Sequence, residues 1–132
     1  DTKWADVAHY YLRSGIKCNV YRGDLTERRG DCKHTVETFG IKHLRVAADS
    51  MTFGCVPILR HRDDMTEAED NECMLVHTRW ISNEEFKNVI WSLTKQHKTF
   101  DQYSTHWLIS HGFDVFGLIE SGQAIRKEMG NG

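Results

Sequence analysis

The hydrophobic period of this sequence changes near residue 60, and this change restricts the folds that the chain can adopt. Before residue 60, several short segments alternate apolar and polar residues and end in turn-forming residues, as "IKCNVYR" does before Gly23 and Asp24. After residue 60, apolar residues recur every three or four positions. Alternation is typical of half-buried strands and the longer period of amphipathic helices, so the sequence predicts a strand-rich first part and a helical second part.

The strand-rich part follows one predicted helix. Apolar side chains in "KWADVAHYYLRSG" have helical spacing from Trp4 to Leu12, and Ser14 and Gly15 end the pattern. Four short strands are predicted after it, at 16–22, 32–40, 41–47 and 51–60. A meander of this size must curl or be covered, which predicts either a small SH3-like barrel or a helix-backed sheet.

Two capping boxes predict where helices begin in the second part. Thr66 with Glu69 marks one start, and Ser82 with Glu85 marks another. Residues 72–80 lie between them, and their β-branched and aromatic content fits either a continued helix or a strand. Both alternatives stay open for this segment.

Two apolar stripes after the second capping box are predicted as packing faces of helices. The second of these helices is expected to end at Gly112. The stripes consist of Phe86, Val89, Ile90 and Leu93, and of Phe100, Tyr103, Trp107 and Leu108.

The closing stretch "HGFDVFGLIESGQAI" is predicted to be core. Asp114 can cap a short helix that Gly122 ends, and Ala124 and Ile125 then return as an extended segment. The apolar residues of the short helix are Val115, Phe116, Leu118 and Ile119. The whole pattern predicts an α+β fold with an N-terminal helix, a small curled antiparallel β meander and a helical C-terminal half. We expect a single domain over 1–132, in which 1–60 and 61–132 share one core.

Three segments resemble a known family. "WADVAHYYL", "PILRHRDDMTEAE" and "LISHGFDVFGLIESGQAI" resemble a family of small uncharacterised proteins from phages and prophages of Bacteroidota, which end on F-D-L-F-G-L-I-E-x-G-L-A-I. The sequence departs from that family at His61 and Arg62, where the family has Pro-Leu. The resemblance implies a phage or prophage accessory protein that acts in the cytoplasm of the host cell, and it implies no particular reaction.

Charge and composition restrict the partners. The formal net charge of −2 disfavours nucleic acid, which requires a basic surface. No apolar run reaches the roughly 20 residues that span a bilayer, so we expect no membrane contact and a cytoplasmic location. A homo-oligomer is compatible with the sequence.

Neither the spacing of the cysteines nor a search for common catalytic motifs indicates an enzyme class. Cys18, Cys32, Cys55 and Cys73 form no C-x-x-C pair and are predicted to be free thiols, with Cys32 and His34 as a weaker metal candidate. The sequence contains no G-x-S-x-G, G-x-x-x-x-G-K-[ST] or G-x-G-x-x-G motif. We therefore predict no cofactor and assign no catalytic or metal-binding residue, and binding is favoured over catalysis.

A basic hairpin is the predicted ligand-binding site. Arg22, Arg28, Arg29, Lys33 and His34 crowd it, with acidic residues between them. The guanidinium group of arginine can donate two hydrogen bonds to phosphate oxygens. The hairpin is therefore predicted to bind a small phosphorylated, nucleotide-like ligand. The alternative is a solvated loop.

Two further places could carry function. Arg79 and Trp80 put a guanidinium next to an aromatic ring, and we expect them between the sheet and the helices. In "HRDD", Asp63 and Asp64 are interpreted as solvated charges at a helix start, with His61 as a candidate general base.

Three functions fit these observations. The first is a non-enzymatic accessory protein that binds a host factor or sequesters a phosphorylated ligand. The second is a small metal-assisted or His/carboxylate hydrolase or lyase. The third is a structural or assembly component of the virion.

Overall fold

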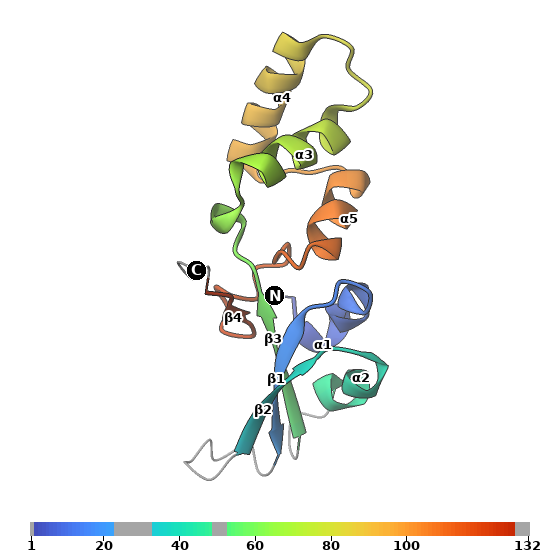
Figure 1. The fold of residues 1–132 in the computed structure, drawn as a ribbon, viewed down its shortest axis with the longest axis vertical. Coiled ribbons are helices and arrows are strands. Elements are labelled where there is room, and N and C mark those ends of the chain that lie inside the picture. The colour runs from blue at the N-terminus through green and yellow to red at the C-terminus, as the bar shows by residue number, and fades with distance from the viewer. Residues whose placement is uncertain (1, 23–32, 49–52, 129–132) are drawn as a thin grey trace.

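The fold is α+β, as the sequence predicts, with helices α3 to α5 at one end of the molecule and the sheet at the other (Figure 1). The computed structural model describes residues 2–22, 33–48 and 53–128. No helix in these segments is long and apolar enough to cross a lipid bilayer. The elements, in chain order, are α1 (Trp4–Val7), η1 (Ala8–Tyr11), β1 (Lys17–Arg22), β2 (Lys33–Thr38), α2 (Ile41–Ala48), β3 (Phe53–Leu59), η2 (Arg62–Asp64), α3 (Glu67–Thr78), α4 (Glu84–His97), α5 (Gln102–Ser110) and β4 (Ile125–Arg126).

Strand β1 is central in a sheet with the order β2-β1-β3-β4. Both β2 and β3 run antiparallel to β1, and Cys18 lies opposite Glu37 on one side and Pro57 on the other. Strand β4 comes from the end of the chain and pairs parallel with the end of β3. The strand prediction is confirmed at 16–22 and in the described parts of 32–40 and 51–60. The four-stranded meander is wrong, because the fourth strand is β4, at the extended end that the sequence predicts.

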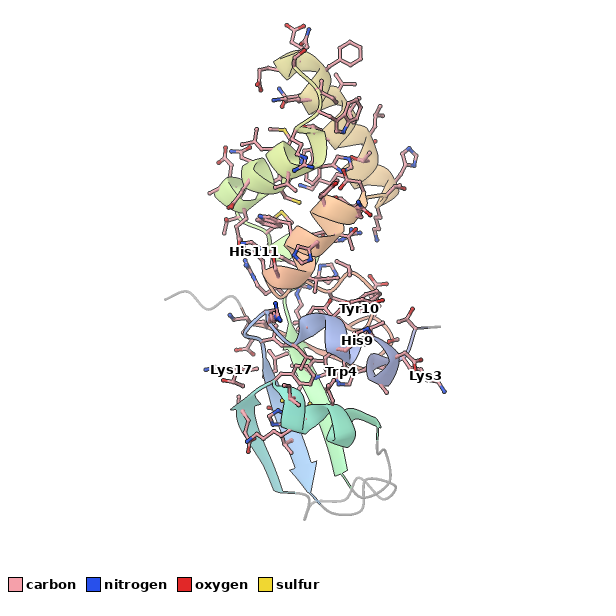
Figure 2. The ribbon with its side chains drawn as sticks, turned by 90° about the vertical axis from the view of Figure 1, so that its right-hand side faces the viewer. Lys3, Trp4, His9, Tyr10, Lys17 and His111 are labelled. Atoms are coloured by element: carbon pink, nitrogen blue, oxygen red, sulfur yellow. The ribbon has the colours of Figure 1, made fainter. Side chains whose placement is uncertain are left out.

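The strand predicted at 41–47 is wrong, because these residues form α2. Most of these residues are good helix formers, and the helix buries His43 and part of Leu44 while Ile41 stays exposed. The buried His43 accepts the backbone N–H of Gly40 at 3.0 Å through Nδ1, and its Nε2 lies 2.9 Å from Glu37 Oε2. With α1, this helix covers one face of the sheet (Figure 2), which is the helix-backed alternative.

Two apolar clusters form the core. The first includes Tyr11, Cys18, Leu59 and Leu118, none of which has exposed surface. Val115 packs against both clusters, so the closing stretch joins them, and its prediction as core is confirmed most fully at Leu118. The second cluster consists of Cys73, Trp91, Trp107, Leu108 and Phe113.

Helices begin at both predicted starts, α3 after Thr66 and α4 within two residues of Ser82, but only the first cap is the predicted one. Thr66 and Glu69 form the expected capping box, and α3 continues to Thr78, so most of residues 72–80 are helical. The Ser82 box is wrong, because the Oδ1 atom of Asn83 accepts the first free N–H groups of α4 instead.

The two predicted apolar stripes differ in burial. Trp107 and Leu108 of α5 are buried, and Gly112 follows this helix with φ +78°, as expected for its stop. On α4, the buried residue is Trp91, which the stripe did not include. The predicted packing face of α4 is exposed instead, by 61% at Phe86, 57% at Val89 and 51% at Leu93.

Candidate functional site

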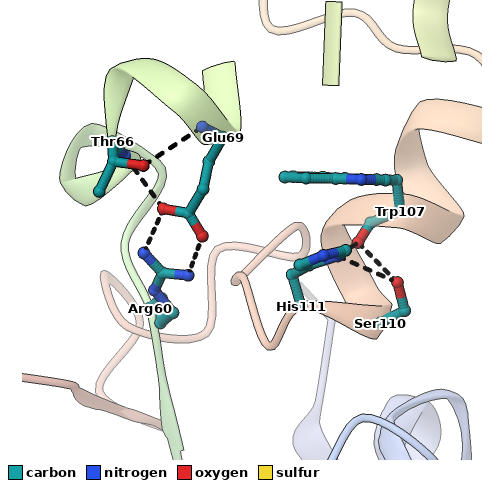
Figure 3. Close-up of polar contacts among 6 residues, drawn as sticks. All are labelled: Arg60, Thr66, Glu69, Trp107, Ser110 and His111. Atoms are coloured by element: carbon teal, nitrogen blue, oxygen red, sulfur yellow. Dashed lines mark hydrogen bonds and ion pairs between the residues drawn. The ribbon is translucent and has the colours of Figure 1, made fainter. Parts of the chain in front are cut away.

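Arg60 connects the sheet to the helices where β3 ends. Its backbone N–H donates to the carbonyl of Gly112, and its carbonyl accepts the N–H of Asp114, both at 2.9 Å. Its guanidinium lies 4.3 Å from the centre of the Phe113 ring and donates two hydrogen bonds to the Glu69 carboxylate (Figure 3). These bonds lower the pKa of Glu69 to about 2.

We expect Glu69→Gln to lower the free energy of unfolding by about 2 kcal/mol at neutral pH, because charge-assisted bonds to Arg60 are lost. The folded-state pKa lies below the ordinary value of 4.5, so the charged carboxylate stabilises the fold fully above that pH. This contribution is lost as the pH falls from 4.5 toward about 2. Urea unfolding of the parent and the variant should give free energies that converge over this range.

The control for this prediction is Glu67→Gln. Glu67 lies in the same first turn of α3 but is exposed, so its loss should cost only about 0.5 kcal/mol through the helix dipole. If the difference in the free energy of unfolding between the parent and Glu69→Gln did not change with pH, this result would contradict the stabilising role of the ion pair.

A pocket of about 590 Å³ lies beside this junction, and we call it the Arg62 pocket. Four segments line it: η2 with its flanks, the end of α4 with the residues that follow, α5 at Thr105, and the turns at 114–120. Its apolar walls include the side chains of Trp91, Phe100 and Phe116. This volume is in the range of sites that bind small molecules.

The guanidinium of Arg62 is the central charged group of this pocket. Its carbon Cζ lies 4.7 Å from the centre of the Phe100 ring, and the residue is half-buried. Burial lowers the pKa of Arg62, because desolvation disfavours the cation more than the fields of Asp114 and Asp63 favour it. Within the described part of the chain, no carboxylate forms an ion pair with Arg62. An anionic ligand would supply the missing partner.

Two lysines add positive charge to the lining. Lys95 forms an ion pair with Asp70 of α3 at 2.8 Å. Lys98 ends α4 in the left-handed conformation, at φ 55° and ψ 30°, which is strained for a residue with a side chain. Lys98 lines the pocket, and its ammonium makes no ion pair with any described residue.

Asp114 fixes the turns that form another wall. Their φ values are positive at Gly117 and Gly122, which interrupts helical hydrogen bonding, so the short helix predicted here is wrong. Asp114 nevertheless accepts backbone N–H groups that follow it, and Gly122 has the predicted left-handed conformation, at φ +80°. The buried carboxylate accepts the backbone N–H groups of Phe116 at 3.1 Å, Leu118 at 3.1 Å and Ile119 at 2.9 Å. These bonds place Phe116 and Glu120 in the pocket lining.

The two aspartates of "HRDD" have separate roles. Asp63 is exposed, in agreement with the predicted solvated position. Asp64 binds Arg126 through two hydrogen bonds, of 2.9 and 2.7 Å, and so ties η2 to β4. His61 Nδ1 accepts the backbone N–H of Asp63 at 3.1 Å, which occupies a lone pair that a general base would use.

A histidine, a serine and an aspartate also meet between α3 and α5. His77 Nδ1 lies 3.2 Å from Ser104 Oγ and 3.6 Å from Asp101 Oδ2. A hydrolytic triad needs the serine and the carboxylate on opposite ring nitrogens, whereas both face Nδ1 here. Ser104 is fully buried, and Asp101 caps α5 by accepting its N–H at 2.7 Å. The trio therefore serves as a structural cap and does not support the hydrolase alternative.

The described cysteines are buried, and the described metal-ligating side chains do not cluster. These residues contain no group of three or more metal-ligating side chains. Cys18, Cys55 and Cys73 are free and buried, as predicted. Burial raises the pKa of Cys73 to about 12, which disfavours a thiolate. Cys32, the predicted metal partner of His34, lies outside the described residues.

The predicted hairpin site is described only in its strands. Arg22 pairs with Lys33, and His34 pairs with Tyr21, in the ladder between β1 and β2. Arg28 and Arg29 lie outside the described residues. Phosphate binding at this hairpin therefore stays a prediction.

The alternative site at Arg79 and Trp80 is not where the sequence places it. Both residues follow α3 in the helical half, away from the sheet (Figure 1). Arg79 lies 4.1 Å from the centre of the Tyr103 ring, and Trp80 is exposed.

A second, smaller pocket of about 220 Å³ lies between β1 and the end of α5. The described residues that line it include four basic side chains and no acidic one, although Arg60 is already paired with Glu69. Figure 2 places Lys17 on the sheet and His111 on the helical half, where its ring stacks on Trp107 at 3.9 Å (Figure 3). The basic residues are Lys17, Arg60, His111 and Lys127.

The Arg62 pocket is assembled from stretches that are separate in the sequence. "HRDD" supplies Arg62, "HKTF" supplies Lys98 and Phe100, and the closing stretch supplies Phe116. No short-range motif links these stretches, so sequence reasoning missed the pocket. Comparisons of the chain with protein-family models, curated proteins and solved structures found no match.

Proposed function

We propose that this chain is a binding protein that holds a small phosphorylated ligand with a planar group in the Arg62 pocket. The observation that carries this proposal is the half-buried guanidinium of Arg62, which stacks on Phe100 and has no carboxylate partner among the described residues. The sequence predicts the same class of ligand but assigns it to the hairpin.

The charges of the pocket favour an anion at Arg62. A guanidinium presents a planar set of donors that matches two phosphate oxygens, and Lys98 supplies a second cation in the same lining. Three carboxylates also line the pocket. The buried Asp114 is occupied by the backbone N–H groups of its own turns, and Asp63 and Glu120 are exposed. Water screens an exposed carboxylate more than it screens a half-buried cation, so the attraction of Arg62 for an anion outweighs their repulsion.

The apolar walls favour a planar group next to the phosphate. Trp91 and Phe116 line the pocket, and Phe116 keeps part of its surface exposed. Stacking of a base on such a ring contributes about 1–3 kcal/mol in other proteins. A nucleotide-like ligand would therefore use Arg62 for its phosphate and these rings for its base. The resemblance to phage proteins favours sequestration of such a ligand in an infected cell.

The test is calorimetric titration of the full chain with ATP, AMP and inorganic phosphate. We expect a nucleotide to bind more tightly than phosphate, and Arg62→Ala to weaken nucleotide binding by about tenfold or more, because charge-assisted hydrogen bonds are lost. The matched control is Lys17→Ala, which removes a cation from the smaller pocket and should leave the affinity unchanged.

Two results would contradict this proposal. One is parental affinity in Arg62→Ala together with loss of binding in the double variant Arg28→Ala with Arg29→Ala, which would place the site in the hairpin. The other is chemically altered ligand recovered after denaturation of the complex, which would show catalysis. Intact ligand, and loss of binding in Arg62→Ala alone, would support the proposal.

A further inference from the structure

The smaller pocket lies where three strands of the sheet meet the end of α5. Lys17 is opposite Ile58 in the ladder of β1 and β3, and Ile58 is opposite Ile125 in the ladder of β3 and β4. Side chains alternate between the two faces of a sheet, so Arg60 and Lys127, each two residues further along, belong to this same face. The strand registers therefore bring three basic residues to one corner of the sheet.

Gly112 lets the end of α5 come close to the start of β1. Its φ is +78°, and a Cβ atom on this residue would lie 3.0 Å from Cγ2 of Ile16. A side chain here would strain the backbone and crowd Ile16, whereas glycine allows the close approach. The approach places His111, the preceding residue, in the same pocket lining as Lys17.

The ring of His111 is held so that Nε2 is the nitrogen left for a ligand. The ring stacks on Trp107, and its Nδ1 lies 2.8 Å from the carbonyl oxygen of Trp107 (Figure 3). A carbonyl oxygen can only accept, so Nδ1 carries the hydrogen of this bond. Protonation of the ring then adds an N–H at Nε2, which gives the pocket both a donor and a positive charge.

The positive charge of this pocket is not balanced by nearby carboxylates. Arg60 is paired with Glu69. Within the described part of the chain, no carboxylate lies within ion-pair distance of Lys17, His111 or Lys127. A hollow lined by charges of one sign concentrates their field, so it attracts an anion more strongly than the same charges on a flat surface would.

We propose that the smaller pocket binds a small tetrahedral oxyanion of the size of inorganic phosphate. Its volume of about 220 Å³ lies below the roughly 300–1,000 Å³ of sites for drug-sized ligands, so it is too small to enclose a nucleotide. A tetrahedral oxyanion has oxygen atoms on all sides, so it can accept hydrogen bonds from the sheet and from α5 at once. The site is separate from the Arg62 pocket, and the inference does not depend on the proposed function.

Titration of the isotope-labelled full chain with sodium sulfate, at an ionic strength held constant with sodium chloride, tests this site. We expect saturable shifts of the amide NMR signals of Lys17, His111 and Gly112. Lys17→Ala should weaken sulfate binding by about tenfold, because a charge-assisted hydrogen bond is lost. Lys3→Ala is the matched control, since it removes the same charge from an exposed position away from the pocket (Figure 2) and should leave the affinity unchanged.

The contribution of His111 is tested by pH. Sulfate keeps its double charge over the range of about pH 8 to 5 in which histidine becomes protonated, so its binding should tighten as the pH falls. The other charged residues of the lining are Lys17, Arg60 and Lys127, and lysine and arginine keep their charge over this range. His111→Gln should remove the tightening, and circular dichroism shows whether each variant is folded.

Four results would overturn the inference. The first is a parent without saturable shifts, and the second is equal weakening by Lys17→Ala and Lys3→Ala, which would show a general attraction to surface charge. The third is the same pH dependence in His111→Gln as in the parent. The fourth is a set of shifts confined to the Arg62 pocket, which would leave the proposed function in place. Loss of sulfate binding in Lys17→Ala with nucleotide binding retained would support two separate sites.

Discussion

Replacing Asp114 by alanine is expected to lower the free energy of unfolding by about 4 kcal/mol. The buried carboxylate accepts three backbone N–H groups, and hydrogen bonds to a charged partner contribute about 1.5–3 kcal/mol each, with incomplete additivity. Alanine would leave these N–H groups without their acceptor and would release the turns that hold Leu118 in the core. Urea unfolding followed by tryptophan fluorescence measures the change.

Asp114→Asn and Asp63→Asn are the two controls. The asparagine side chain in the first variant would keep one oxygen, which can still accept the N–H groups of Phe116 and Leu118, so we expect about half of the loss. Asp63 is exposed, and its replacement should cost less than about 0.5 kcal/mol. Similar unfolding midpoints for Asp114→Ala and Asp63→Asn would contradict the assigned role of Asp114.

The sequence predicts best where the signal is local. The first helix, the capping box at Thr66 and Glu69, and the cap at Asp114 each depend on residues within a few positions of one another. Short-range hydrogen bonding decides such features, and tertiary packing does not override them. The predicted α+β class follows from the same local periods.

The sequence predicts poorly where tertiary contacts decide. The alternation in segment 41–47 predicts a strand, but the segment packs as helix α2 against β3 and α1. The apolar stripe of α4 reads as a core face, yet Trp91 on the other side is the residue that packs. The spacing of apolar residues shows that a helix has an apolar face. It does not show which surface packs against that face.

The candidate site could not be found from spacing in the sequence. Arg62 and Phe116 are far apart along the chain, and they meet because Arg60 bridges β3 to the closing stretch through Gly112 and Asp114. From the sequence, the ligand-binding site is assigned to the hairpin because its basic residues are close in sequence. A search for functional residues that are close in sequence finds sites within one loop. It misses sites whose residues come together only when the chain folds.

Leu118→Asp is the second large effect that we expect, and it should prevent stable folding. Leu118 has no exposed surface and lies in the cluster with Tyr11, Cys18 and Leu59. A charge at this position would be buried without a partner, which costs more than about 4 kcal/mol and exceeds the stability of many small domains. Circular dichroism and the dispersion of amide signals in NMR spectra would show the loss of the native state.

The matched comparison is Phe116→Asp, which adds the same charge two residues earlier. From the sequence, Phe116 is expected to be as critical as any residue in this stretch, but its ring is only half-buried and lines the Arg62 pocket. An aspartate there can turn toward water, so we expect a loss of about 1–2 kcal/mol and a folded protein. The same variant should weaken nucleotide binding, because it replaces an aromatic wall by a negative charge beside a phosphate. Equal unfolding midpoints for the two aspartate variants would show that Phe116 belongs to the core and not to the pocket.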